Sequence, residues 1–122
     1  MLLERLNALL RDSDSLLSRE RDGHRRMYLY DMGDWWVSFE RSACRLCGLF
    51  PGCDTTVLRL YDRPYPLVMA SVSDRSLRAY ARRHPLQRVS TGCLSLPCGE
   101  LSSARYASWR RQILFDGEEP AG

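Results

Sequence analysis

The chain of 122 residues contains no lysine, and all 18 of its basic residues are arginines. A nucleotide-binding P-loop needs a lysine that reaches the phosphates, so the absence of lysine excludes a P-loop ATPase. Asparagine and isoleucine occur once each, as Asn7 and Ile113. The codons of these three amino acids are rich in A and T, so we interpret the bias as that of a GC-rich genome. Arginine content alone therefore does not indicate phosphate recognition.

The sequence also has no apolar run near the roughly 20 residues that a membrane-spanning helix needs. Its first residues do not resemble a secretory signal, because Glu4, Arg5 and Arg11 interrupt the apolar positions. We therefore expect a cytoplasmic protein without a membrane partner. Hydrophobic residues make up 44% of the chain, which is enough for one domain with its own core.

Residue patterns typical of catalysis are scarce. The two histidines, His24 and His84, lie in charged stretches, and nothing in the sequence pairs either one with a nucleophile. No glycine-rich dinucleotide motif and no H-E-x-x-H zinc motif occurs. Asp31 and Asp34 flank Met-Gly, where aspartate commonly forms a turn. We predict a non-catalytic protein without a cofactor.

The five cysteines are an odd number, which argues against a disulfide framework. Cys44 and Cys47 form a C-x2-C pair, and Cys93 and Cys98 form a C-x4-C pair. Four thiolates could hold zinc, and a zinc-stabilised domain is one alternative. The first pair, however, lies in a stretch predicted as a helix, and free cysteines are commonly buried. We therefore favour buried thiols.

The hydrophobic periodicity predicts an α/β domain. Leucines at helical spacing indicate an amphipathic helix within residues 2–19. The rest of the pattern predicts a bent strand or hairpin at 27–37, a helix between Ser38 and Gly48, strands at 55–62 and 66–70, a helix at 73–84 and a strand at 86–96. Residues 101–115 fit either a helix or a strand. This order predicts a small mixed β-sheet flanked by about three helices.

We expect three segments along the chain. Residues 1–24 form the amphipathic helix and a loop, packed on the domain or bound to a protein partner or a second copy. Residues 25–115 form one α/β domain. Residues 116–122 form a frayed acidic tail.

The charge is distributed unevenly. Residues 1–62 carry nine arginines and ten acidic residues, whereas residues 63–111 carry nine arginines and only two acidic residues. Arg75, Arg78 and Arg82 share one face of the helix predicted at 73–84, and Arg83 lies beside them. Such a face either contacts phosphates or is a solvated helix surface. Four further arginines could extend it: Arg88, Arg105, Arg110 and Arg111.

Three blocks carry a resemblance to a known family. They are YLYDMGDWWVSFERSACRL, YPLVMASVSDRSLRAY and RVSTGC, and together they cover roughly residues 25–95. Met-Gly-Asp followed by two aromatic residues, then a phenylalanine and a helix with small residues, resembles the N-terminal mismatch-recognition domain of MutS DNA-repair proteins. The other two blocks are similar to that domain in order and approximate spacing. The resemblance implies a mixed α/β sheet flanked by helices.

The resemblance also implies roles for individual residues. In the family, the first aromatic residue after Met-Gly-Asp stacks on a mispaired base, and Trp35 holds that position here. Trp36 would then face the core. Val37 stands where the family has a glutamate that hydrogen-bonds the base, and valine cannot make that bond. The clamp and the ATPase of the family are missing from this chain, which implies a stand-alone module of a mobile element or an accessory DNA factor.

We therefore predict a non-catalytic module that binds DNA weakly. Trp35 would stack on a base, and Arg75, Arg78, Arg82 and Arg83 would contact the phosphate backbone. The alternative is a protein–protein interaction module that docks through the leucine-rich residues 2–17 or through the surface around Trp35.

Overall fold

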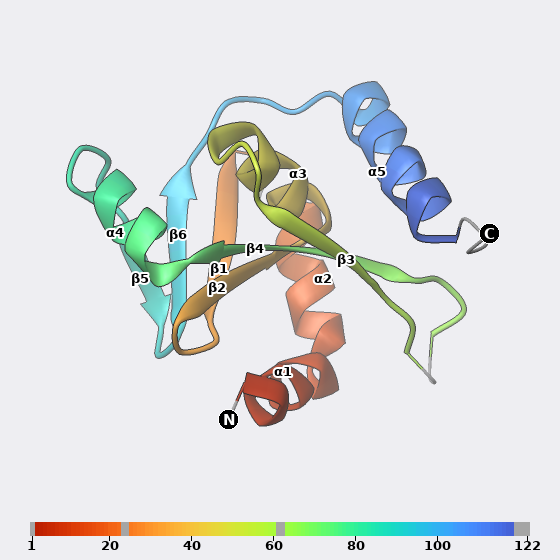
Figure 1. The fold of residues 1–122 in the computed structure, drawn as a ribbon, viewed down its shortest axis with the longest axis horizontal. Coiled ribbons are helices and arrows are strands. Elements are labelled where there is room, and N and C mark those ends of the chain that lie inside the picture. The colour runs from red at the N-terminus through yellow and green to blue at the C-terminus, as the bar shows by residue number, and fades with distance from the viewer. Residues whose placement is uncertain (1, 23–24, 61–62, 119–122) are drawn as a thin grey trace.

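The computed structural model describes residues 2–22, 25–60 and 63–118, and within them a six-stranded sheet is flanked by five helices (Figure 1). The strands are β1 (Arg26–Asp31), β2 (Trp35–Phe39), β3 (Asp54–Leu58), β4 (Leu67–Ser73), β5 (Gln87–Ser90) and β6 (Cys93–Pro97). The helices are α1 (Leu2–Arg11), α2 (Ser13–Asp22), α3 (Glu40–Leu49), α4 (Asp74–Ala81) and α5 (Ser103–Glu118). The strand order is β3-β4-β2-β1-β6-β5, and every neighbouring pair is antiparallel.

Short turns explain the antiparallel pairing at the centre of the sheet. Gly33 has a φ of +97°, which allows the tight turn between β1 and β2. The Met32 amide donates to the Trp35 carbonyl at 2.8 Å, and the Gly33 amide donates to the Asp31 carboxylate at 2.8 Å. Residues 27–37 therefore form a hairpin rather than one bent strand.

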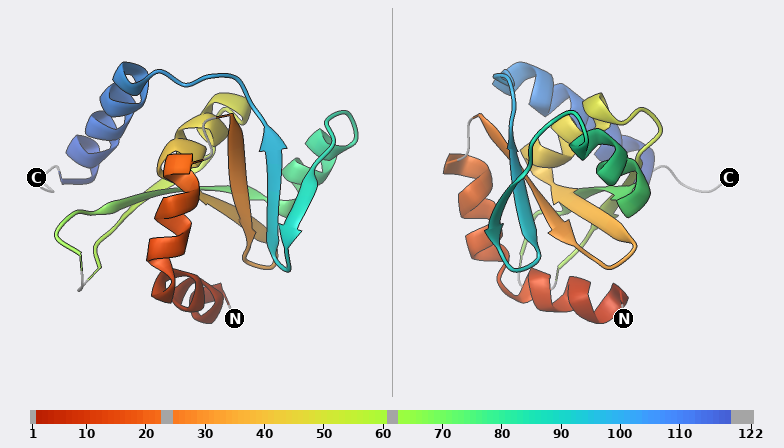
Figure 2. Two further views of the ribbon diagram at one scale, coloured as in Figure 1. Left: turned by 180° about the vertical axis from the view of Figure 1, so that it is seen from behind. Right: turned by 90° about the vertical axis from the view of Figure 1, so that its left-hand side faces the viewer.

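The alternation of side chains gives the sheet two apolar faces. One face, which we call the α3 face, includes Met27, Leu29 and Val72 and packs against α3, α4 and α5. The other, which we call the α1 face, includes Tyr30 and Phe39 and packs against leucines of α1 and α2. Figure 2 shows the sheet between these two helical layers. None of the described helices is long and apolar enough to span a membrane.

The expected α/β class is confirmed, and the details differ in three respects. The six strands form a fully antiparallel sheet, whereas a mixed sheet was expected. Two of the antiparallel pairs arise because hairpins join β1 to β2 and β5 to β6. Gly92, with a φ of +77°, divides the single strand expected at 86–96 into β5 and β6. The described residues contain five helices rather than about three, because the N-terminal segment forms both α1 and α2 and residues 103–118 form α5.

The segment boundaries also follow from these elements. Helix α2 begins at Ser13, so the expected N-terminal helix is interrupted near Asp12. Strand β3 ends at Leu58, earlier than expected, and residues 61–62 lie outside the described residues. Helix α5 extends to Glu118, three residues into the segment expected as a frayed tail, and residues 119–122 lie outside the described residues.

Candidate functional site

The two adjacent tryptophans point to opposite faces of the sheet, because they are successive residues of β2. Trp36 is half-buried in the α3 face, and its indole Nε1 donates to the Asp74 carboxylate at 2.9 Å. This bond, together with the Arg78 guanidinium, lowers the pKa of Asp74 below its ordinary value. Trp35 is 42% exposed. Trp35 is therefore the tryptophan that is accessible to a partner.

Trp35 lies beside a small apolar cavity of about 220 Å³ on the α1 face. Leu6 of α1 forms part of its wall, and Met32, Val37 and Met69 are among its apolar lining residues. Val37 is only 3% exposed, so the position that the MutS resemblance aligns with a base-binding glutamate is a buried apolar side chain here. The surroundings of Trp35 can supply stacking and apolar contact.

The four predicted arginines lie on α4 and at its end, and all of them are exposed. Leu77 is buried on the opposite side of the helix and fixes α4 to the α3 face. The Ser73 side chain caps the first turn by accepting from the Ser76 amide at 3.1 Å. Arg78 donates to Asp74 at 2.6 Å, so its charge is partly compensated. Arg75, Arg82 and Arg83 have no carboxylate within ion-pair distance among the described residues.

Trp35 and the α4 arginines lie at the same end of the sheet but on opposite faces. Trp35 is the strand partner of Ser73, which directly precedes α4. The Trp35 side chain points to the α1 face, whereas α4 packs on the α3 face. A nucleic acid that contacted both would have to pass around this end of the sheet.

Of the four arginines expected to extend the basic surface, one is not available. Arg110 donates to the Glu40 carboxylate at 2.8 Å and to the Pro66 carbonyl at 2.6 Å. Arg88, Arg105 and Arg111 are exposed. The basic surface therefore excludes Arg110, whose charge holds α5 to the domain.

The cysteines do not form the zinc site that the sequence left open. Cys93 belongs to the apolar cluster of the α1 face, whereas Cys47 and Cys98 pack against the cluster of the α3 face. Among residues 2–22, 25–60 and 63–118, no group of three or more His, Cys, Asp or Glu side chains could hold a metal ion. Burial raises the pKa of Cys44, Cys93 and Cys98 above the ordinary thiol value, which favours neutral thiols.

Two carboxylates that no sequence motif marked, those of Glu40 and Glu20, are buried. Glu40, the first residue of α3, accepts from the Tyr106 hydroxyl at 2.6 Å, from Arg110 at 2.8 Å and from the Val68 amide at 3.3 Å. Its φ is +50°, an uncommon conformation for a residue with a side chain. Burial and the neighbouring Glu40 raise the pKa of Tyr106. Glu40 therefore joins α3, β4 and α5.

The second carboxylate, Glu20, joins α2 to α3. It is 5% exposed and accepts from the Ser42 amide at 2.8 Å and from the Ser42 hydroxyl at 2.6 Å. Burial raises its pKa from 4.5 to about 7, although the hydrogen bonds from Ser42 act in the opposite direction. Glu20 therefore changes its protonation near neutral pH.

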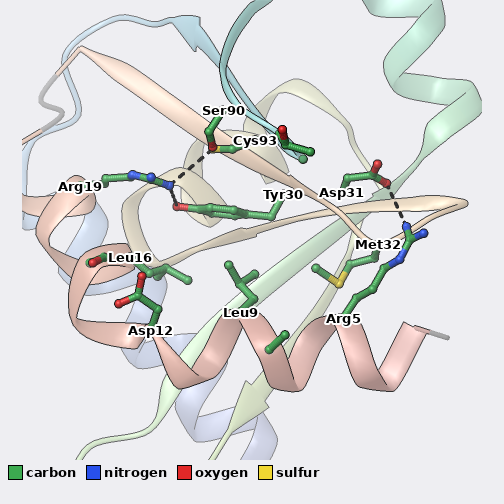
Figure 3. A pocket seen from close by; sticks show the side chains of 14 residues that line it. Arg5, Leu9, Asp12, Leu16, Arg19, Tyr30, Asp31, Met32, Ser90 and Cys93 are labelled. Atoms are coloured by element: carbon green, nitrogen blue, oxygen red, sulfur yellow. Dashed lines mark hydrogen bonds and ion pairs between the residues drawn. The ribbon is translucent and has the colours of Figure 1, made fainter.

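A pocket of about 420 Å³ lies between α1, α2, β1 and the β5–β6 turn (Figure 3). Arg19 lies at one end of this pocket with Tyr30 and Cys93, and the ion pair between Arg5 and Asp31 lies at the other end. Nothing in the linear sequence marked Arg19, because its neighbours in the pocket come from distant elements.

Comparisons with known proteins identify no relative of this chain. No family model, no curated protein and no solved structure matches the chain. The resemblance to the MutS N-terminal domain stays a prediction that rests on the three sequence blocks alone.

Proposed function

We propose that the protein is a non-catalytic accessory module that binds DNA weakly, with α4 as its phosphate-contacting surface. The observation that carries this proposal is the exposed arginine face of α4, in which Arg75, Arg82 and Arg83 have no acidic partner among the described residues. Guanidinium groups bind phosphate oxygens through paired hydrogen bonds and remain charged at all physiological pH values. Binding would be electrostatic and independent of sequence.

Trp35 supplies the second contact in this proposal. Its exposed ring can stack on a base, an interaction worth about 1–3 kcal/mol. The buried Val37 offers no hydrogen bond to that base. The proposed module therefore prefers unpaired or single-stranded bases for their stacking and does not discriminate among mismatches.

Neutralising α4 should weaken DNA binding more than the removal of exposed arginines elsewhere. The triple variant Arg75→Ala, Arg82→Ala, Arg83→Ala leaves the Arg78–Asp74 pair in place. We expect at least about a tenfold weaker affinity for a labelled 20-base-pair DNA duplex at low salt, measured by fluorescence anisotropy. Because each lost phosphate contact removes about 0.9 from the slope of log K against log salt, that slope should fall by about 2 to 3.

Exposed arginines of the α1 and α2 layer provide the control. Arg11 and Arg21 are exposed, and their helices cover the opposite face of the sheet. The Arg11→Ala, Arg21→Ala variant should keep most of the affinity of the native protein. Equal losses of DNA affinity in both variants would indicate diffuse charge attraction and contradict a specific role of α4. The proposal would be refuted if the native protein showed no salt-dependent binding to DNA.

Replacement of Trp35 by alanine should reduce the affinity for single-stranded DNA by about tenfold, because the stacking contact is lost. Tyr65, which is 76% exposed, serves as the matched aromatic control. Tyr65→Ala should bind single-stranded DNA like the native protein. If Trp35→Ala and Tyr65→Ala both bind normally, the stacking role of Trp35 is wrong.

A further inference from the structure

The pocket in Figure 3 is separate from α4 and from Trp35. Its volume of about 420 Å³ falls in the range of metabolite-sized pockets, which is about 300–1,000 Å³. Side chains from α1, α2, β1 and the β5–β6 turn line it, so the fold of the whole domain brings them together.

One end of the pocket holds the guanidinium of Arg19. Arg19 Nη1 donates to the Tyr30 hydroxyl oxygen at 3.5 Å and contacts Cys93 Sγ at 3.6 Å. Among the described residues, no carboxylate lies within ion-pair distance of Arg19, whereas Arg63 and Arg110 both pair with acids. The Tyr30 contact raises the pKa of Arg19 further, so the guanidinium stays charged. Within the part of the chain that the structure describes, its hydrogen-bond partners are neutral, weak acceptors.

Further donors converge on the same end. Burial raises the pKa of Tyr30 to about 12, so its hydroxyl is protonated at neutral pH. That hydroxyl oxygen already accepts from Arg19, and its proton has no acceptor among the residues that the structure describes. Ser90, at the end of β5, also lines this pocket and carries a hydroxyl. A guanidinium and two hydroxyl donors are the groups that bind an oxyanion.

The middle of the pocket is largely apolar. Leu9 of α1, Leu16 of α2 and Met32 line it, and Asp12 lies beside Leu16 (Figure 3). At the far end, Arg5 and Asp31 approach within 3.6 Å and compensate each other's charge. The arrangement therefore offers the Arg19 guanidinium at one end, with apolar side chains and the Asp12 carboxylate next to it.

We infer that this pocket binds a small organic oxyanion, a carboxylate or a phosphate monoester, whose charged group lies against Arg19 and whose apolar part lies along Leu9, Leu16 and Met32. Arg19 would exchange its weak contacts for a charge-assisted pair of hydrogen bonds, and Tyr30 would donate the third. The site does not depend on the DNA-binding proposal, because it shares no residue with α4 or Trp35.

Calorimetric titration with phenylacetate, phenyl phosphate and 2-phenylethanol tests the inference. The native protein should bind at least one of the two anions saturably and should not bind the neutral alcohol. Whichever anion binds more tightly identifies the head group. Arg19→Gln should weaken that binding by at least about tenfold, because a charge-assisted hydrogen bond is lost. Arg21→Gln, an exposed site on the same helix, should bind like the native protein.

Two further variants keep the test decisive. Tyr30→Phe preserves the buried ring, including its packing against Phe39, and should weaken anion binding several-fold by removing one donor. The α4 triple variant should bind the anion normally, which separates this site from DNA binding. The inference is overturned if neither anion binds saturably, if the alcohol binds as well as the anions, or if Arg19→Gln and Tyr30→Phe, shown by circular dichroism to be folded, both bind like Arg21→Gln.

Discussion

Raising the pH from about 4.5 to 8 should lower the contribution of Glu20 to the free energy of unfolding by about 3 kcal/mol. The pKa of Glu20 is about 7 in the folded protein and 4.5 as its reference value. Between these values the folded carboxyl holds a proton that the unfolded chain has released, so each rise in pH favours the unfolded state. Each unit of difference between the folded and unfolded pKa values changes the free energy of unfolding by about 1.4 kcal/mol.

The charged groups around Glu20 determine the size of this effect. Arg45 on α3 favours the ionised carboxylate, whereas Glu40 on the same helix disfavours it. Ser42 donates to both oxygens and stabilises the charge. Burial outweighs these hydrogen bonds, so the pKa is raised. The destabilised contact is the one that joins α2 to α3.

Glu20→Gln isolates this contribution, because the amide keeps the shape of the carboxyl and cannot ionise. We expect Glu20→Gln to match the native protein near pH 4.5 and to exceed its stability at pH 8 by up to about 3 kcal/mol. Urea unfolding at several pH values measures the difference. Glu100→Gln, on an exposed residue, should follow the native curve. A constant difference between Glu20→Gln and the native protein from pH 4.5 to 8 would contradict the prediction.

Removal of the Glu40 carboxylate should cost about 3–5 kcal/mol of stability. In Glu40→Ala, Arg110 and the Tyr106 hydroxyl lose a common acceptor, and the Val68 amide loses its partner. The uncompensated Arg110 charge is held between α5 and β4, where solvent reaches it only in part. Because Tyr106 and Arg110 both lie on α5, we expect that helix to detach first. Hydrogen exchange should show faster exchange in α5 than in the central strands.

A double-mutant cycle separates the ion pair from simple loss of packing. Arg110→Met removes the charge that Glu40→Ala leaves uncompensated, so the double variant should be more stable than the sum of the two single losses predicts. Arg111→Met changes an exposed neighbour and should alter stability by no more than about 0.5 kcal/mol. Strict additivity of the Glu40 and Arg110 variants would show that the pair does not couple α5 to the domain.

Local sequence patterns predicted most of the elements. Leucines at spacings of three and four marked α1 and α2, and the segment predicted at 73–84 contains α4. The MutS resemblance assigned Trp36 to the core, and the structure places it against the α3-face cluster. These features are local, because side-chain direction follows from the backbone period of a helix or a strand.

Residues 101–115 show why local pattern was not sufficient elsewhere. Their apolar residues fit a helix and a strand about equally, and the structure resolves the choice in favour of α5. Ser102 caps the first turn by accepting from the Arg105 amide at 3.1 Å. Tyr106 and Arg110, one helical turn apart, then meet the same carboxylate of Glu40. Tyr106 and Arg110 can share this acceptor only when α5 packs on α3, so the local pattern does not encode the contact.

The sequence by itself determined most of the element types, the absence of lysine and the excess of arginine over acidic residues in the second half of the chain. Only the tertiary structure decided which arginines are paired. Arg110 meets Glu40 across 70 positions, whereas Arg82 and Arg83 stay exposed and Arg19 faces a pocket without a carboxylate partner among the described residues. The reason is physical: charge pairing and desolvation depend on distance in space, which spacing along the chain does not encode.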